Sequence, residues 1–399
     1  MEIEQIIQLS ALAKKQVVIN PNRRDLYSLV SNHQDKTYLG IIGPRGVGKT
    51  VLLKQLHQAN QASIYISLDS LDRNTNLFEL VKVLHENYKF QIFYLDEIHF
   101  LNETDKYLKN IFDFLDVHII FTSSISLKLY QSAYDLSRRV KLVNLYSFSF
   151  REFLKFSNFQ VPKALSLEEI LNENFSPEHT STAIYLKQYL QGANYPISLE
   201  VSDLQTALKN NLDKIIYSDI PRTYKLTFDE LDLIMKAFKF IARAPVSDIN
   251  GTTLANNLKI TRYKAIQYLD ILERAFIINQ IQPWGTNVLK EPKVLLTLPY
   301  RLLEQEFSNA LGGLREDFAV DCLLRSKINF NYLKTKIGKK TPDLILNHNQ
   351  EHIIIEIGGK NKSARQFKDV DPKLRKMIFS DSDLHKPGHL PLVLLGFLE

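Results

Sequence analysis

The stretch of the chain that most constrains its fold is GPRGVGKT, at positions 43–50. It satisfies the pattern G-x-x-x-x-G-K-[ST] at every fixed position. An apolar run at 38–42 precedes it and a helix-forming run at 51–56 follows, so it joins a buried strand to a helix. Its glycines let backbone N–H groups turn toward phosphate oxygens, and the helix N-terminus adds the positive end of its dipole. The sequence therefore predicts a phosphate-binding loop; a chance glycine-rich turn is the alternative.

Within this loop, Lys49 is expected to reach the β- and γ-phosphates of ATP, and the Thr50 hydroxyl to bind Mg²⁺. ATP and Mg²⁺ are therefore the predicted cofactors. The other predicted nucleotide-binding residues are Gly43, Pro44, Arg45, Gly46, Val47, Gly48 and Val51.

An acidic pair completes the predicted phosphate site. Four apolar residues, 92–95, lead to Asp96 and Glu97. At the end of a strand beside the loop, Asp96 can hold the Mg²⁺ shell, and Glu97 can act as the general base that takes a proton from the attacking water. A surface acidic pair after an ordinary strand is the alternative.

Two further groups of polar residues are candidates for the same chemistry. A later apolar strand ends near Thr122 and Ser124, where a hydroxyl can contact the γ-phosphate or the water; capping of the strand end is the alternative.

Arg138 and Arg139 stand just before the next strand. An arginine there can stabilise the transferred phosphoryl group as a finger, in its own chain or from a neighbouring subunit. A solvated basic pair is the alternative.

Strand-like and helix-like segments alternate through the first part of the chain. The strand candidates are 36–42, 62–68, 91–96, 117–122 and 140–145, with helix candidates at 51–58 and 77–88 between them. Several of the strands are rich in Ile, Val, Tyr and Phe, as buried parallel strands are. The alternation predicts an α/β fold, a P-loop nucleoside triphosphatase with a parallel sheet. A strand candidate between the two motifs predicts that their strands are not neighbours in that sheet.

The rest of the chain divides into three predicted parts. A proline-punctuated helical stretch after residue 155 is interpreted as a lid. Three helix candidates followed by two strand candidates then give the order of a winged helix-turn-helix, and the last part has an α/β pattern. The predicted domains are 1–155, 156–222, 223–300 and 301–399.

The third helix candidate of the winged helix-turn-helix, 261–274, has a face suited to DNA. Thr261 can cap it, and an apolar stripe at helical spacing is expected to point inward. That stripe is Ala265, Ile266, Leu269 and Leu272. Outside it lie Arg262, Tyr263 and Lys264, near the helix end that reads a major groove. A winged helix that contacts protein or serves as a rigid connector is the alternative.

Positive charge is concentrated near the C-terminus. The chain has a net charge of +6, yet residues 325–376 alone hold 13 Lys and Arg against 5 Asp and Glu. A local basic surface indicates an anionic partner more strongly than a mild overall excess does. The nucleic-acid candidates here are Lys360, Lys362, Arg365 and Lys368, with a solvated face as the alternative.

Three carboxylates in the last part form a candidate metal site. A hairpin loop at 348–351 would pair 347 with 352, and so Asp343 with Glu356. Like charges directly opposite each other on two strands repel. A bound cation would relieve that repulsion, and Glu316, in a helical stretch, can join the pair.

The chain resembles the prokaryotic AAA-type ATPases whose C-terminal region is a PD-(D/E)XK nuclease-like domain. The matching stretches are GPRGVGKT, IFYLDEIH, IIFTSSIS and LSRRVKLVNLYSFSFREFL. The chain departs from the family pattern at two glycines, in Thr122–Ser124 and at Ser137. The resemblance implies an ATPase with Glu316, Asp343 and Glu356 as a nuclease-type metal site. The lysine essential to that pattern should lie two residues after Glu356, where Gly358 stands; Lys360 is the nearest substitute.

We therefore expect an ATP-hydrolysing AAA-type protein with a degenerate nuclease-like domain, acting on or regulated by nucleic acid. The alternative is a nucleotide-dependent signalling switch whose C-terminal half binds a protein, and a homo-oligomer stays open. Cys322 is the one cysteine, which excludes an intrachain disulfide. Without a signal peptide or an apolar run of ~20 residues, a soluble cytoplasmic protein is expected.

Overall fold

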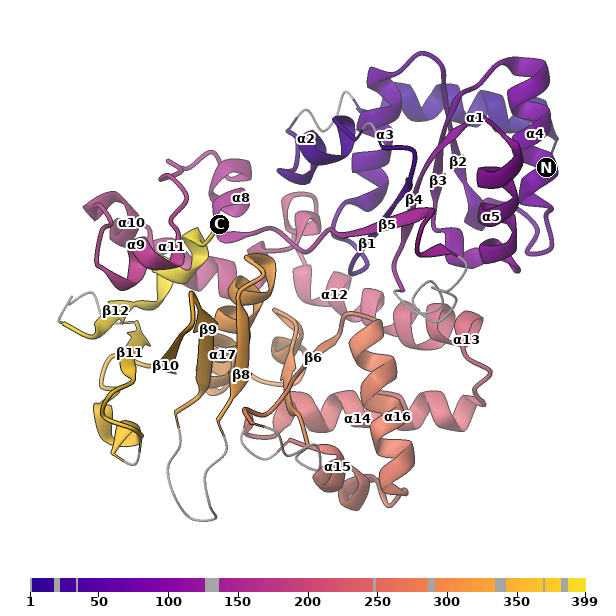
Figure 1. Cartoon of the computed structure of the whole chain (residues 1–399). Helices are drawn as coiled ribbons and strands as arrows, with labels where there is room; N and C mark the ends of the chain where they lie inside the picture. The colour runs from indigo at the N-terminus through magenta and orange to yellow at the C-terminus, as the bar shows by residue number, and fades with distance from the viewer. Residues whose placement is uncertain are drawn as a thin grey trace. The chain divides into compact units, whose positions relative to one another are not determined.

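The chain forms two compact units (Figure 1). The computed structural model describes residues 2–17, 22–33, 35–125, 136–246, 249–285, 291–333, 342–368, 370–381 and 387–399. The first unit comprises 1–147 and 211–226, and the second comprises 148–210 and 227–399. The stretch 156–222, predicted as one lid, is therefore divided, because its last part packs into the first unit. Residues 148–155, predicted to end the first domain, belong to the second unit.

A five-stranded parallel sheet organises the first unit, in the order β2-β3-β4-β1-β5. All five predicted strands form: β1 (Tyr38–Ile42), β2 (Ser63–Ser67), β3 (Ile92–Asp96), β4 (His118–Ser123) and β5 (Val140–Asn144). Since β4 lies between β1 and β3, the prediction that the two motif-bearing strands are not neighbours is confirmed. β2, which lies between them in sequence, takes the edge of the sheet.

Helices cover both faces of this sheet. They are α1 (Ile3–Gln16), α2 (Leu26–Ser31), α3 (Lys49–Ala59), α4 (Leu77–Tyr88) and α5 (Thr104–Phe114), with a short η2 (Leu68–Ser70). α3 carries the chain outward from β1 to β2, whereas α4 and α5 bring it back, so right-handed crossovers place them on opposite faces. α1 packs with α3, and α4 packs with α5 (Figure 1). Both faces are therefore buried, which is why the strands are apolar throughout.

Segment 211–226 returns to the first unit after a long excursion through the second. It holds the end of α12 (Leu204–Lys214), η6 (Ile215–Asp219) and α13 (Ile220–Thr223). α13 contacts η3 (Ile98–Phe100), which follows the acidic pair. There the Arg222 guanidinium lies 3.8 Å from the centre of the Phe100 ring. The returning segment thus packs beside the predicted phosphate site.

The second unit contains a mixed sheet in the order β12-β11-β10-β9-β8. Its strands are β8 (Asn329–Tyr332), β9 (Leu344–His348), β10 (Glu351–Gly358), β11 (Arg375–Ser380) and β12 (His389–Pro391). β10, β11 and β12 are parallel, and β8 and β9 are antiparallel to their neighbours. Helix α17 (Phe307–Arg325) packs on β10, and Phe318, Leu346 and Ile355 are buried in the shared core. The predicted α/β character of this part is confirmed.

Three helices and a two-stranded antiparallel sheet precede that part, in the predicted order. They are α14 (Phe228–Arg243), α15 (Gly251–Leu258), α16 (Arg262–Arg274), β6 (Ile278–Ile281) and β7 (Lys293–Leu296). The Thr261 side chain caps α16 by accepting a hydrogen bond from the Lys264 N–H. The inward stripe differs at one position: Ile266 is 39% exposed and Tyr268 is buried instead. Positions 265, 268, 269 and 272 follow the 3.6-residue period, and 266 falls off it.

The remaining elements of the second unit are short. They are α8 (Phe150–Phe156), α9 (Leu167–Leu171), α10 (Pro177–Ser181), α11 (Ala183–Gln188), η4 (Tyr189–Ala193), η5 (Pro196–Leu199), η8 (Tyr300–Leu303), η9 (Ala364–Phe367) and η10 (Leu392–Phe397). In the part of the chain that the structure describes, no helix is long and apolar enough to cross a membrane.

Candidate functional site

The predicted phosphate loop lies at the carboxyl end of β1. Gly48 stands before the first turn of α3 with φ of +91°, a left-handed conformation that favours glycine. A Cβ at Gly43 would lie 2.0 Å from the Leu145 carbonyl oxygen, so a side chain there would push the loop away from the residue that follows β5. The loop conformation therefore depends on glycine at two of the positions that the motif fixes.

Lys49 begins α3 and folds back over the loop. Its buried Nζ donates to the carbonyl oxygens of Gly43 at 2.8 Å and Pro44 at 2.9 Å. Burial lowers the pKa of Lys49, although Glu97 and Asp96 oppose that shift. The ammonium is thus held at the loop that would receive a nucleotide phosphate.

Asp96 ends β3 beside Thr50, as predicted. Its Oδ2 accepts hydrogen bonds from the Thr50 hydroxyl at 2.7 Å and the Tyr65 hydroxyl at 2.8 Å, and its Oδ1 accepts from Thr122. Burial raises the pKa of Asp96, although its hydroxyl partners partly offset that shift. A hydroxyl and a carboxylate in contact are oxygen ligands of the kind that Mg²⁺ takes. The residues present therefore fit the predicted metal.

Glu97 directly follows β3, at the carboxyl ends of the strands, and polar contacts hold its side chain there. Its Oε2 accepts hydrogen bonds from the Ser124 N–H at 3.1 Å and the Ser124 hydroxyl at 2.7 Å, and His99 Nδ1 lies 3.3 Å away. Burial raises the pKa of Glu97, but Lys49 and His99 outweigh it, and the net pKa is lowered. The carboxyl group is therefore ionised near neutral pH and able to accept a proton. Ser124 lies at this site as predicted, in contact with Glu97.

Arg138 and Arg139 lie at the amino ends of the parallel strands, whereas the phosphate loop lies at their carboxyl ends. In the parallel register, Tyr38 at the start of β1 pairs with Val140, and Ile42 at its end pairs with Asn144. With about 3.3 Å per residue, the length of β1 separates both arginines from the loop by roughly 13 Å or more. Arg139 instead forms an ion pair with Asp113 at 2.9 Å. The prediction of a finger within the same chain is therefore wrong for these residues; a finger contributed to a neighbouring subunit stays a prediction.

Two arginine contacts at the loop were not predicted. Arg24, from the segment before α2, donates through Nη1 to the Val47 carbonyl at 2.6 Å and through Nη2 to the carbonyls of Tyr146 and Ser147 at 2.9 and 3.1 Å. Arg45, within the loop, donates to Asp219 Oδ2 at 2.8 Å. No local pattern in the sequence marks either contact, because each joins segments that are far apart in the chain.

The carboxylates of the second unit meet as predicted, with a shorter turn. Asn347 pairs with His352, and the ladder continues to Leu344 with Ile355, so the predicted register is confirmed. The turn has two residues, 349 and 350, instead of four, and both have left-handed φ angles. The side chain of Asp343 accepts a hydrogen bond from the Ile357 N–H at 2.8 Å.

Two lysines occupy this carboxylate cluster. Lys293 Nζ lies 2.7 Å from Glu316 and 3.8 Å from Asp343, and Lys362 Nζ lies 2.5 Å from Glu356. Lys362, rather than the predicted Lys360, thus takes the place beside Glu356. A Cβ at residue 358 would lie 2.4 Å from Lys362 Cδ, so Gly358 leaves room for that lysine.

Ion pairs with lysines lie where the metal was predicted in this cluster. Across the residues that the structure describes, no group of three or more His, Cys, Asp and Glu side chains is arranged to hold a metal ion. Burial and Glu316 nevertheless raise the pKa of Asp343 to about 7. The lysines supply positive charge to the carboxylates, whose repulsion a bound cation was expected to relieve.

The predicted DNA-contacting residues of α16 are exposed but largely paired. Tyr263 is 79% exposed. Arg262 pairs with Glu291 at 2.6 Å, and Lys264 pairs with Glu230 at 3.1 Å. Two of the three predicted contacts are therefore neutralised by carboxylates of the same unit.

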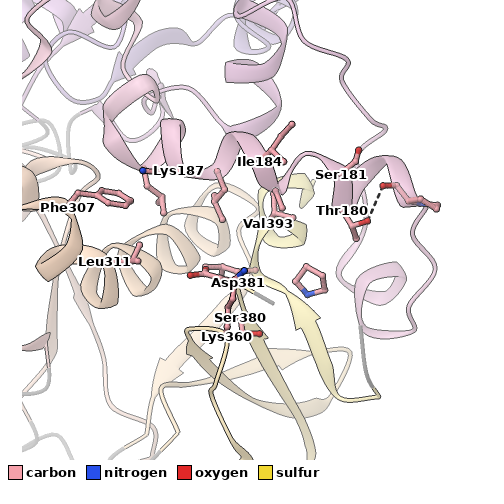
Figure 2. Close-up of a pocket in the computed structure, with 16 residues that line it drawn as sticks. Thr180, Ser181, Ile184, Lys187, Phe307, Leu311, Lys360, Ser380, Asp381 and Val393 are labelled. Atoms are coloured by element: carbon pink, nitrogen blue, oxygen red, sulfur yellow. Dashed lines mark hydrogen bonds between the residues drawn. The ribbon is translucent and has the colours of Figure 1, made fainter. Parts of the chain in front are cut away.

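A cavity of 640 Å³ lies at the carboxyl ends of β11 and β12 (Figure 2). α10, α11 and α17 supply further walls, with Ile184, Leu311 and Val393 among the apolar side chains. Lys187 Nζ lies 5.7 Å from the centre of the Phe307 ring, and Lys360 also lines the cavity. Lys360 is thus associated with a mainly apolar cavity, whereas Arg365 and Lys368 are exposed.

The comparisons with known proteins match the fold of the first unit. Residues 35–154 match the AAA domain family, and residues 185–297 match a domain of unknown function, DUF8612. Together with the parallel sheet and its loop, the first match defines an AAA-type P-loop domain. This similarity supports ATP binding of the AAA type by residues 35–154.

Its relatives include two proteins of Methanocaldococcus jannaschii that are described as uncharacterized. MJ1637 is 28% identical over 396 residues, which covers 89% of this chain and 83% of that protein. MJ1544 is 23% identical over 401 residues, covering 96% and 87%. Among solved structures, the S. cerevisiae Hsp104–ADP complex aligns at 19% identity with a TM-score of 0.29. The alignment covers 62% of this chain and 38% of that chain. C. elegans PCH-2 aligns at 17% identity with a TM-score of 0.24, covering 67% of each chain.

Proposed function

We propose that the first unit hydrolyses ATP at its phosphate loop. The observation that carries this proposal is the hydrogen bond between Thr50 and Asp96, because it joins the loop to the strand that bears the acidic pair. In this assignment Lys49 binds the β- and γ-phosphates and the remaining loop residues bind the nucleotide. Thr50 and Asp96 would hold Mg²⁺, which would neutralise phosphate charge when bound.

Glu97 is the proposed general base. Ser124 and His99 hold its carboxylate at the carboxyl edge of the sheet, where β1 and β3 also end. An ionised carboxylate in that position can take the proton of a water that attacks the γ-phosphorus. Ser124 is therefore proposed to orient the base, in place of direct contact with the phosphate.

The replacement Glu97→Gln tests this assignment. The amide keeps the size of the side chain but cannot accept the proton, so we expect ATP binding to persist while turnover falls by about 100-fold or more. Binding is measured with ATP by equilibrium dialysis, and turnover by phosphate release. Glu103→Gln, at an exposed position before α5, is the control. Normal turnover in Glu97→Gln would place the base elsewhere.

We propose nucleic acid as the partner of the second unit, with residues 223–300 acting as a winged helix-turn-helix. The support is the exposed Tyr263 between two cationic residues at the start of α16, together with the basic stretch 325–376. Within 301–399, a degenerate nuclease-like domain would bind through the exposed Arg365 and Lys368 without cleaving. The ion pairs of Arg262 and Lys264 favour the alternative, a nucleotide-dependent switch that binds a protein.

A gel shift with double-stranded DNA discriminates between these functions. Binding to phosphates should weaken steeply as salt rises. Glu291→Gln releases Arg262 from its ion pair, so we expect tighter binding and a salt slope larger by about one. Glu351→Gln, which removes an exposed charge from β10, is the matched control. A protein that ignores DNA and RNA at low salt, with or without Glu291, would favour the protein-binding switch.

A further inference from the structure

Arg45 places a guanidinium at the phosphate loop. One of its nitrogens, Nη1, donates to Asp219 at 2.8 Å, and 20% of the side chain is exposed. A guanidinium has five N–H donors in a planar fork. The bond to Asp219 therefore leaves donors with which Arg45 can contact a phosphoryl oxygen.

Contacts on two sides bring Arg45 close to both proposed catalytic groups. Lys49 Nζ donates to the carbonyl oxygens of Gly43 and Pro44, the two residues before Arg45. Asp219, which holds Arg45, directly precedes α13, and α13 contacts η3, which begins directly after Glu97. Arg45 therefore lies near the place where a γ-phosphoryl group bound by Lys49 would face Glu97. This is the region in which negative charge spreads over the transferred oxygens during phosphoryl transfer.

Asp219 is well placed to orient Arg45. It ends η6 in the returning segment 211–226, and its side chain is fully buried. Its second oxygen, Oδ1, has no hydrogen-bond partner among the described residues. Because a buried carboxylate needs a positive partner, Asp219 and Arg45 hold each other in one geometry. The arginine of this segment, Arg222, packs against the Phe100 ring.

We infer that Arg45 is a catalytic arginine supplied by the loop itself, and that Asp219 is the residue that positions it; this inference rests on the proposed ATP hydrolysis. As the water oxygen bonds to the γ-phosphorus, the bond from that phosphorus to the bridging oxygen breaks and its electron pair passes to ADP. The water proton goes to Glu97. Arg45 stabilises the equatorial oxygens throughout and exchanges no proton.

The test compares wild type with Arg45→Ala, Arg45→Lys and Asp219→Asn in the full chain. We measure kcat and KM for ATP, and the Kd of ADP with Mg²⁺ in the presence and absence of aluminium fluoride, which imitates the transferred phosphoryl group. A catalytic arginine is worth about 10³–10⁵ in kcat, so Arg45→Ala should lose at least about 100-fold in kcat. Its KM and its Kd for ADP alone should change less than about threefold, while the tightening by aluminium fluoride is lost.

Asp219→Asn separates positioning from a structural role. It should lower kcat about tenfold and weaken the aluminium fluoride effect, with ADP binding retained; a role in folding alone would lower the melting temperature and leave the effect intact. If Arg45→Ala fails to fold, Arg45→Lys carries the test, because it keeps the charge and loses the planar fork. Arg73→Ala, at an exposed arginine of the same unit to which no role is assigned, is the matched control.

The inference is overturned if Arg45→Ala or Arg45→Lys retains the full aluminium fluoride effect, or if Arg73→Ala loses it and Arg45→Ala does not. In both cases wild type would still hydrolyse ATP and Glu97→Gln would still trap it, so the proposed function would stand. Absence of hydrolysis by wild type would instead remove the proposed function and this inference with it.

Discussion

Among single residues, Asp343 lies in an unusual charge environment. Burial and the nearby Glu316 raise its pKa to about 7, well above its value in an unfolded chain. Such a group stabilises the fold fully at low pH, and that contribution is lost as the pH rises through about 7. The lysines beside it soften this loss, since Lys293 favours the ionised form.

The replacement Asp343→Asn should remove this pH dependence. At pH 8 we expect the variant to match wild type or exceed its free energy of unfolding by about 1 kcal/mol, the scale of a cross-strand pair. At pH 5, where Asp343 is protonated in the folded protein, the advantage should shrink. Urea unfolding at both pH values measures this, with Glu351→Gln as the control on the neighbouring strand. A variant that is less stable than wild type at pH 8 would contradict the account, and so would a rise in melting temperature with Mn²⁺ that only wild type shows.

At the scale of elements, three segments hold the phosphate loop in place. β1 leads into it and α3 leads out of it, whereas Arg24, before α2, bonds the Val47 carbonyl to the chain after β5. Arg24 is a buried cation that donates to these carbonyl oxygens. Hydrogen bonds to charged groups contribute about 1.5–3 kcal/mol each at most. The loop is therefore braced by a segment that precedes it by about 20 residues in the sequence.

Arg24→Ala should destabilise the first unit by about 2–4 kcal/mol, because it leaves buried carbonyl oxygens without a partner. It should also weaken ATP binding, since the Val47 carbonyl is no longer held. The neighbouring replacement Arg23→Ala is the control: its guanidinium lies over the Tyr27 ring at 4.2 Å, a contact worth about 1 kcal/mol or less at an exposed site. Thermal unfolding and nucleotide titration of both variants provide the measurement. Equal effects of the two replacements would argue against the brace.

Local patterns made most of these elements predictable. The loop motif, the acidic pair and the strand register around Asp343 follow from residues that are close in sequence. The distant partners were not predictable, because Arg24 and Asp219 reach the loop only through the folded arrangement. Long lysine side chains likewise reach across turns, so Lys362 takes a place that strand spacing assigned to Lys360. The position of Arg138 was predictable, because the sequence places it just before a strand candidate of a parallel sheet, and so at the end of the sheet opposite to the phosphate loop.

For the molecule as a whole, the return of segment 211–226 is the main departure from a linear order of domains. The chain leaves the first unit after residue 147, returns at 211 and leaves again after 226. Asp219 and Arg222 of this segment contact the loop and the residues after the acidic pair. The chain continues from both ends of this segment directly into the second unit, so the segment joins the proposed ATP site covalently to that unit.

The central claim is that residues 43–50 and the acidic pair form a site that hydrolyses ATP. The most direct test is the rate of phosphate release from ATP and Mg²⁺ by the full chain, compared with Lys49→Ala and with Lys54→Ala, a control on the same helix. Loss of the ammonium on the β- and γ-phosphates should abolish turnover and weaken ATP binding in Lys49→Ala, while Lys54→Ala should retain wild-type turnover. Wild-type turnover by Lys49→Ala would remove the loop from the mechanism and contradict the account.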